Sequence, residues 1–70
     1  PASAAMWQEL QDRVDAAIAT LDEADQEVIR LKHSKQLANQ EIARTLGLTE
    51  AAASMRYLRA LRRLKTALAP

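Results

Sequence analysis

Residues 39–64 read NQEIARTLGLTEAAASMRYLRALRRL, and the order of residue types in this stretch decides the fold. The stretch predicts a short helix, a turn at Gly47 and a second helix over about 50–68. Gly47 stands where a helix commonly ends on a left-handed residue, and Thr49 supplies a hydroxyl that can cap the next helix. This spacing is typical of a helix-turn-helix, which we place at about 39–66.

The small and aliphatic residues of the stretch predict how its two helices pack. Ala43 and Ala53 are expected at the crossing point, because only small side chains let two helices approach closely there. The first helix is expected to open at Asn39 or Ala38. The small core between the helices is expected to contain Ile42, Leu46, Leu48 and Ala53.

The second helix has an apolar face and a basic face. At about 100° per residue, the side chains near the direction of Tyr57 form a buried stripe of Ala53, Ala60, Leu61 and Leu64. The opposite side carries Ala51, Met55, Arg59, Arg62 and Thr66, with Leu58 at its edge and Arg56 and Arg63 on a flank. Short side chains let a helix approach a DNA major groove, and arginines reach phosphates or guanine edges. A solvated face of a helical bundle would explain the arginines, but not an exposed Met55 and Leu58.

Two further helices are predicted before this stretch. The first has Ser3 as its N-cap and a stripe of apolar residues, on which Trp7 is expected to anchor the core. That stripe consists of Trp7, Leu10, Val14, Ala17, Ile18 and Leu21. The second begins after Asp22, ends before a polar break at 34–36, and buries Val28, Ile29 and Leu31. The sequence therefore predicts an all-α, four-helix domain.

Composition agrees with helices and limits the chemistry. The chain has one glycine, two prolines at its ends and no phenylalanine, a composition that favours helix. It has no cysteine, which excludes disulfides and thiolate metal sites. His33 is the only histidine, so we expect it to cap a helix or be partly buried, and we expect no enzyme activity, no metal and no cofactor. Because no apolar run approaches the ~20 residues that span a bilayer, we expect a cytoplasmic protein without a membrane partner.

Charge is divided unequally along the chain. Residues 1–27 hold seven acids against Arg13, a net charge of −6, whereas residues 28–70 hold nine bases against two acids, a net charge of +7. This asymmetry favours a polyanion-binding surface in the second part of the chain, with the acidic first helix turned away from it. A basic helix that is merely solvated is the alternative.

Residues 21–68 resemble the C-terminal (fourth) domain of bacterial sigma factors, in particular the extracytoplasmic-function type. The resemblance covers about two thirds of the chain, and its specific parts are EIAxxLGLTE at 41–50 and MRxLRALRRL at 55–64. It implies that the last helix binds the minus-thirty-five promoter element in the major groove. It also implies that the domain contacts the flap of the RNA polymerase β subunit, and that an anti-sigma factor is a further possible partner.

The resemblance also implies roles for individual residues. The side chains expected to face bases are Ser54, Met55, Leu58 and Arg59. Those expected to hold phosphates are Arg44, Thr49, Arg56, Arg62 and Arg63. The sequence departs from the family pattern at Ala38, where a capping serine is usual, and at Ser54, where a lysine or arginine is frequent.

Two other functions remain open at this point. The DNA-binding effector domain of LuxR-type response regulators is similar to this chain from the second helix to the LGLTE sequence at 46–50. Those domains usually carry a valine-lysine-x-histidine series where this chain has residues 53–56. A helical module that binds only proteins is the other alternative. Because the chain starts at Pro1, we expect residues 1–70 to be a single domain excised from a longer protein.

Overall fold

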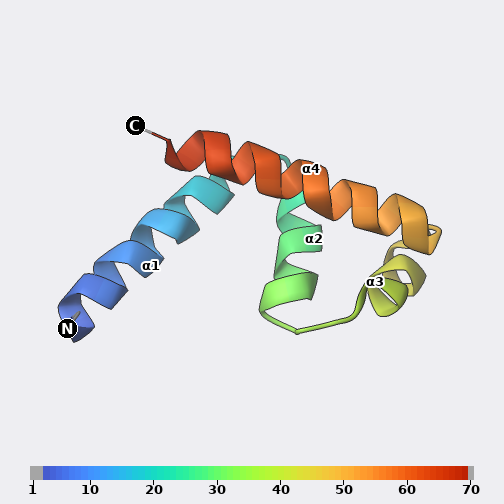
Figure 1. The fold of residues 1–70 in the computed structure, drawn as a ribbon, viewed down its shortest axis with the longest axis horizontal. Coiled ribbons are helices and arrows are strands. Elements are labelled where there is room, and N and C mark those ends of the chain that lie inside the picture. The colour runs from blue at the N-terminus through green and yellow to red at the C-terminus, as the bar shows by residue number, and fades with distance from the viewer. Residues whose placement is uncertain (1–2, 70) are drawn as a thin grey trace.

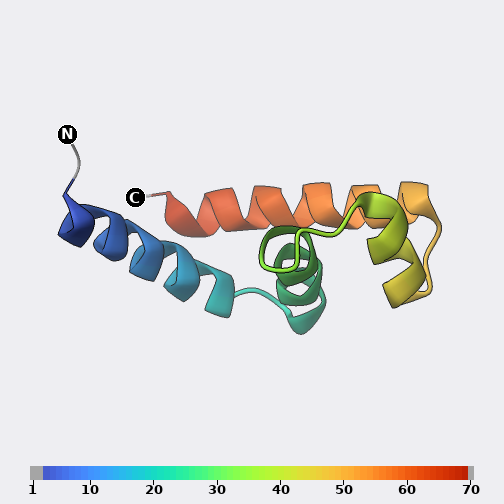
Figure 2. The same ribbon diagram turned by 90° about the horizontal axis from the view of Figure 1, so that it is seen from below.

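The computed structural model describes residues 3–69 as four helices joined by short turns, which confirms the predicted all-α fold class (Figure 1). The helices are α1 (Ala4–Ala19), α2 (Glu23–His33), α3 (Asn39–Leu46) and α4 (Glu50–Leu68). The other helices meet α4 in chain order, from α1 near its C-terminal end to α3 at its N-terminal end (Figures 1 and 2). The molecule is elongated, with extents of 40 × 22 × 17 Å, and α3 lies at the end opposite α1, together with the turn that leads into α4.

Hydroxyl side chains begin the first and last helices as the sequence predicts. The Ser3 hydroxyl accepts a hydrogen bond from the Met6 N–H at 3.2 Å, and the Thr49 hydroxyl accepts one from the Ala52 N–H at 3.1 Å. Asp22 stands at the N-cap of α2, but its carboxylate makes no capping hydrogen bond. The predicted start of α2 after Asp22 is therefore correct, although the Asp22 side chain does not cap the helix.

Two left-handed residues shape the turns on either side of α3. Gly47 has φ 70° and ψ 33°, and its position confirms the predicted turn. The N–H of Leu48 then donates to the Ala43 carbonyl at 2.8 Å, which folds the chain back onto α3. Gln36, in the polar break after α2, has φ 54°, so this break is also a sharp turn.

The core lies where α2, α3 and α4 meet. Its buried members are Val28, Ile29, Leu31, Ile42, Ala43, Ala53 and Ala60. Ala53 is 1% exposed and Ala43 5%, which confirms that small residues lie at the contact between the two helices of the helix-turn-helix. Leu46, Tyr57 and Leu64 are half-buried against this core. Packing against α2 and α3 therefore fixes which face of α4 remains exposed.

Helix α1 contributes less to the core than its apolar stripe predicts. Ala17 is buried and Ile18 is half-buried against the core, but Trp7 is 62% and Leu10 46% exposed. The prediction that Trp7 anchors the core is wrong, because the first turns of α1 extend away from the other helices and none of residues 3–69 covers the Trp7 side chain (Figure 1). Within the described part of the chain, no helix is sufficiently long and apolar to cross a membrane.

Candidate nucleic-acid interface

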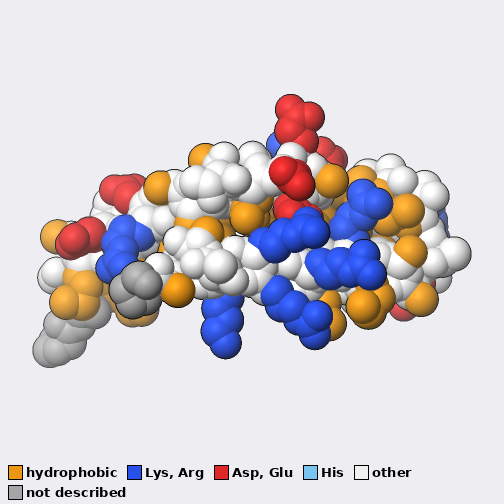
Figure 3. Space-filling view, turned by 90° about the horizontal axis from the view of Figure 1, so that it is seen from above, with side chains coloured by type: hydrophobic (Ala, Val, Ile, Leu, Met, Phe, Trp, Pro, Cys, Tyr) orange, Lys and Arg blue, Asp and Glu red, His pale blue; other side chains and the backbone are white. Residues whose placement is uncertain are grey.

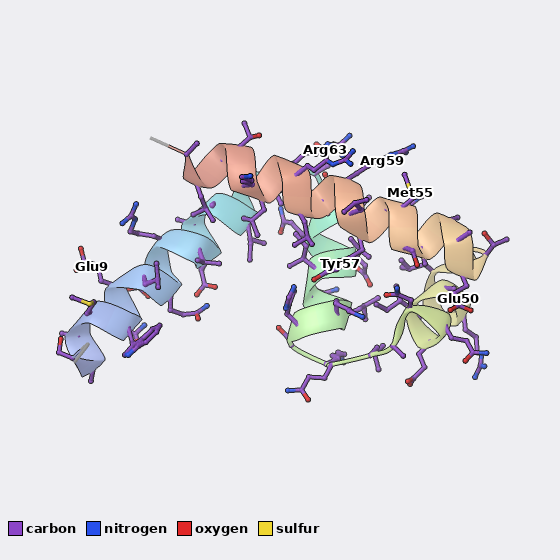
Figure 4. All side chains as sticks on the ribbon, viewed as in Figure 1. Glu9, Glu50, Met55, Tyr57, Arg59 and Arg63 are labelled. Carbon is purple, nitrogen blue, oxygen red and sulfur yellow. The ribbon has the colours of Figure 1, made fainter. Side chains whose placement is uncertain are left out.

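The outer face of α4 lies opposite the side that packs on the core, and one edge of it borders the first turn of α2. Met55, Arg59 and Arg63 project from this side, whereas Tyr57 points towards α2 (Figure 4). Ala51 and Ala52, in the first turn, are exposed, so the start of the face carries only methyl groups. Met55 is 45% and Leu58 41% exposed, which is unusual for large apolar side chains and agrees with the predicted helix wheel.

A shallow groove of about 550 Å³ runs beside this face, between α4 and the first turn of α2. Its lining residues are Ala24, Asp25, Leu48, Ala51, Ala52, Met55, Arg56, Arg59 and Arg63. Four of the residues proposed from the sequence as DNA contacts are thus brought together: Met55, Arg56, Arg59 and Arg63. Basic side chains gather along this surface of α4 (Figure 3). The groove therefore combines apolar contact area with guanidinium donors, the groups that contact thymine methyls and phosphates or guanines.

Arg63 is tied to a buried carboxylate. Its Nη1 donates to Oδ2 of Asp25 at 2.6 Å, and the two side chains are 56% and 5% exposed, respectively. The hydrogen bond that Arg63 donates to this carboxylate, followed by the negative charge of the carboxylate, raises the pKa of Arg63 above its ordinary value. The ion pair joins the C-terminal half of α4 to the first turn of α2, at the edge of the groove.

Ser54 faces α3 and takes part in a chain of hydrogen bonds across three helices. Lys32 Nζ donates to Asn39 Oδ1 at 3.2 Å, and Asn39 Nδ2 donates to Ser54 Oγ at 2.9 Å. Ser54 is half-buried, whereas Met55 beside it is exposed. The chain connects the end of α2, the start of α3 and the second turn of α4, and so fixes how α4 sits on α3.

The remaining predicted contacts lie apart from the groove. Arg44 is exposed on α3, and Arg62 is exposed on α4 without lining the groove. Leu58 is exposed on α4 and does not line the groove, and the Thr49 hydroxyl is already engaged as the helix cap. The structure thus brings four of the predicted DNA contacts together in the groove, whereas the other predicted contacts lie outside it.

His33 lies at the end of α2 and is exposed, although the sequence predicts a cap or a partly buried residue. Its Nε2 lies 2.7 Å from the Tyr57 hydroxyl, and Lys32 Nζ lies 5.7 Å from the centre of the Tyr57 ring. Tyr57 is thus held from the α2 side. Among residues 3–69, no three acidic or histidine side chains are grouped to hold a metal ion.

Asp25 is the functional-site residue that sequence reasoning missed. An acid in the first turn of a helix is fully accounted for by the helix dipole, so nothing in the local sequence marks it as buried. Its partner lies 38 positions later in the chain. Only the approach of α2 to α4 in the folded chain reveals the pair.

Comparison with known proteins agrees with this geometry. A family model described as sigma-70, region 4, matches residues 11–64, which include the helix-turn-helix and the groove residues. No curated protein sequence and no solved structure matches the chain. Region 4 is a helical, non-enzymatic domain through which sigma factors recognise the minus-thirty-five promoter region and contact RNA polymerase. Because the match covers more than half of the chain, this protein belongs to the sigma-70 region 4 family.

Proposed function

We propose that this chain is the promoter-recognition domain of an extracytoplasmic-function sigma factor, and that α4 enters the major groove of the minus-thirty-five element. The observation that carries the proposal is the outer face of α4, where exposed methyl groups precede exposed Met55 and Arg59. A helix of 19 residues is about 28 Å long, so its first turns can lie in the groove while its later turns pass the phosphate backbone.

The position of each side chain supports a division of roles. Met55 and Arg59 follow each other by one helical turn on the outermost line of α4, so they are assigned to base edges. Arg56 lies on a flank of that line and is assigned to a phosphate. Ser54, which is bonded to Asn39, supports base recognition by holding α4 on α3.

A second groove supports contact with RNA polymerase, for which we propose the β flap as the partner. It measures about 530 Å³ and lies between α1, α2 and α4, with Val14, Ile18, Ile29, Leu61 and Leu64 as its apolar lining. Leu61 and Leu64 lie on the opposite side of α4 from Arg59, so a partner in this groove leaves the DNA face open. The exposed Trp7 and Leu10 continue its apolar surface along α1.

Selection of duplexes from a randomised pool, followed by binding measurements on the selected and scrambled sequences, tests the DNA contact. Arg59→Ala is expected to cost about 1–3 kcal/mol on the selected duplex and less on the scrambled one, as for a lost base contact. Arg44→Ala, on α3, is the matched control and should weaken both duplexes alike. Failure of the wild-type chain to prefer any sequence would refute promoter recognition.

Retention of the chain by core RNA polymerase separates a sigma domain from a LuxR-type effector domain. Leu61→Ser, in the second groove, should reduce retention while preserving the salt-dependent binding of DNA. Arg59→Ala should show the reverse pattern, because the two surfaces lie on opposite sides of α4. Circular dichroism of each variant confirms that it is folded. A wild-type chain that binds DNA but not polymerase would favour the LuxR-type alternative.

A further inference from the structure

Asp25 places a negative charge at the edge of the surface assigned to DNA. Among residues 3–69 it is the one charged residue that is buried, with 4% of its surface exposed. It lines the same groove as Met55, Arg59 and Arg63, and its carboxylate is bonded to Arg63. A carboxylate close to a phosphate backbone repels it, so the presence of Asp25 in this groove requires a reason beyond its favourable interaction with the helix dipole.

The pair is not readily opened by DNA. If Arg63 moved to a phosphate, it would leave the Asp25 carboxylate buried without a counter-ion, which is strongly unfavourable. Arg63 uses one of its five N–H donors on Asp25, and more than half of its side chain remains exposed. Its other donors can therefore reach a phosphate while the ion pair stays intact.

We propose that Asp25 masks the charge of Arg63 towards DNA, so that Arg63 serves as an oriented hydrogen-bond donor and not as a free cation. The proposal rests on the proposed function, because it requires that the groove lined by Arg63 belongs to the surface that binds DNA. Asp25 is a positioning residue in this role. Its effect is to limit sequence-independent attraction at a point where the helix passes the backbone, while the direction of the Arg63 donors is retained.

The physical consequence is a change in the number of counterions released on binding. Each phosphate neutralised by a full positive charge contributes about −0.9 to the slope of log K against log salt concentration. A neutral pair contributes almost nothing to that slope, although it still donates a hydrogen bond. Masking thus predicts that Arg63 contributes almost nothing to the slope of log K against log salt concentration for the wild-type chain.

The experiment measures this slope on a scrambled duplex, from about 50 to 200 mM salt, for the wild-type chain and its variants. Asp25→Asn keeps the shape and an acceptor for Arg63 but frees its charge, so the slope should steepen by about 0.9. At about 0.1 M salt, the affinity for the scrambled duplex should rise on the order of eightfold. The preference for the selected duplex should fall, because the added attraction is independent of sequence.

The matched control is Glu23→Gln, which removes the same charge from an exposed position in the same turn of α2. Its slope should remain close to that of the wild type, because Glu23 makes no ion pair with Arg63. The double variant Asp25→Asn with Arg63→Gln replaces the ion pair by two neutral amides. Masking predicts the wild-type slope for it, whereas a freely acting Arg63 predicts a slope shallower by about 0.9.

The double variant keeps the proposal testable even if Asp25→Asn fails to fold, and circular dichroism identifies that case. Equal slopes for Asp25→Asn, Glu23→Gln and the wild type would overturn masking while leaving promoter recognition intact. A shallower slope for the double variant would have the same meaning. If the wild-type chain binds no duplex at all, the proposed function fails, and the masking role fails with it.

Discussion

Replacement of Ile42 and of Trp7 by alanine should separate the true core from the apolar stripe of α1. Ile42 is fully buried between α2, α3 and α4, whereas Trp7 is 62% exposed. Ile42→Ala removes three buried carbons at about 0.8 kcal/mol each, hence about 2.4 kcal/mol, and an uncollapsed cavity raises the loss to roughly 4 kcal/mol. Trp7→Ala removes a much larger side chain but should change stability by no more than about 0.5 kcal/mol.

The two losses differ in their consequence because a domain of this size is stabilised by only about 3–5 kcal/mol. Ile42→Ala should lower the melting temperature by about 10 °C or more, or abolish the transition, whereas Trp7→Ala should melt within a few degrees of the wild type. Far-ultraviolet circular dichroism is the suitable signal, since Trp7 is the only tryptophan and its removal eliminates intrinsic tryptophan fluorescence. A loss for Trp7→Ala equal to that for Ile42→Ala would refute the assignment of the core to α2, α3 and α4.

Three further tests concern the turn, the helix crossing and the acidic helix. Gly47→Val should lower the free energy of unfolding by more than about 1 kcal/mol, because φ is 70° at this position. The cost comes from the backbone alone, since an added Cβ would meet no atom within 4 Å, and an unchanged thermal melt would contradict the prediction. Ala53→Asp should unfold the domain by burying an unpaired charge, whereas Ala52→Asp, exposed one residue earlier, should leave the circular dichroism spectrum unchanged. Reversal of Asp12 and Asp15 to lysine should strengthen binding to all duplexes slightly, and a large loss of affinity in the folded variant would place α1 at the DNA.

Local sequence signals predict most of this fold. Gly47, Thr49 and Ser3 mark helix ends through the conformation or hydrogen bond that each residue type favours, and the structure confirms all three. Ala43 and Ala53 likewise reveal a close helix crossing, because small residues permit it. These features depend on neighbours in sequence, or on one helix face, and so are visible without coordinates.

What the sequence does not predict depends on where helices meet in space. A helical stripe shows which face of α1 is apolar, but not how far along that face another helix extends, so the sequence does not predict the exposure of Trp7. The bonds of Asp25 to Arg63 and of Asn39 to Ser54 join residues 38 and 15 positions apart. The helical periodicity of α4 therefore predicts which of its residues are exposed in the candidate site. It does not predict the hydrogen bonds that orient Ser54 and Arg63.

The exposed position of Trp7 allows its intrinsic fluorescence to report the binding of a partner. As the only tryptophan, and largely open to water, it should emit at long wavelength in the free protein. A protein partner that covers α1 would exclude water from the indole and shift its emission to shorter wavelength. DNA bound along the first turns of α4 would leave that emission unchanged, because Trp7 belongs to the first turns of α1, which extend away from the other helices (Figure 1). One unlabelled sample can therefore distinguish which of its two surfaces is occupied.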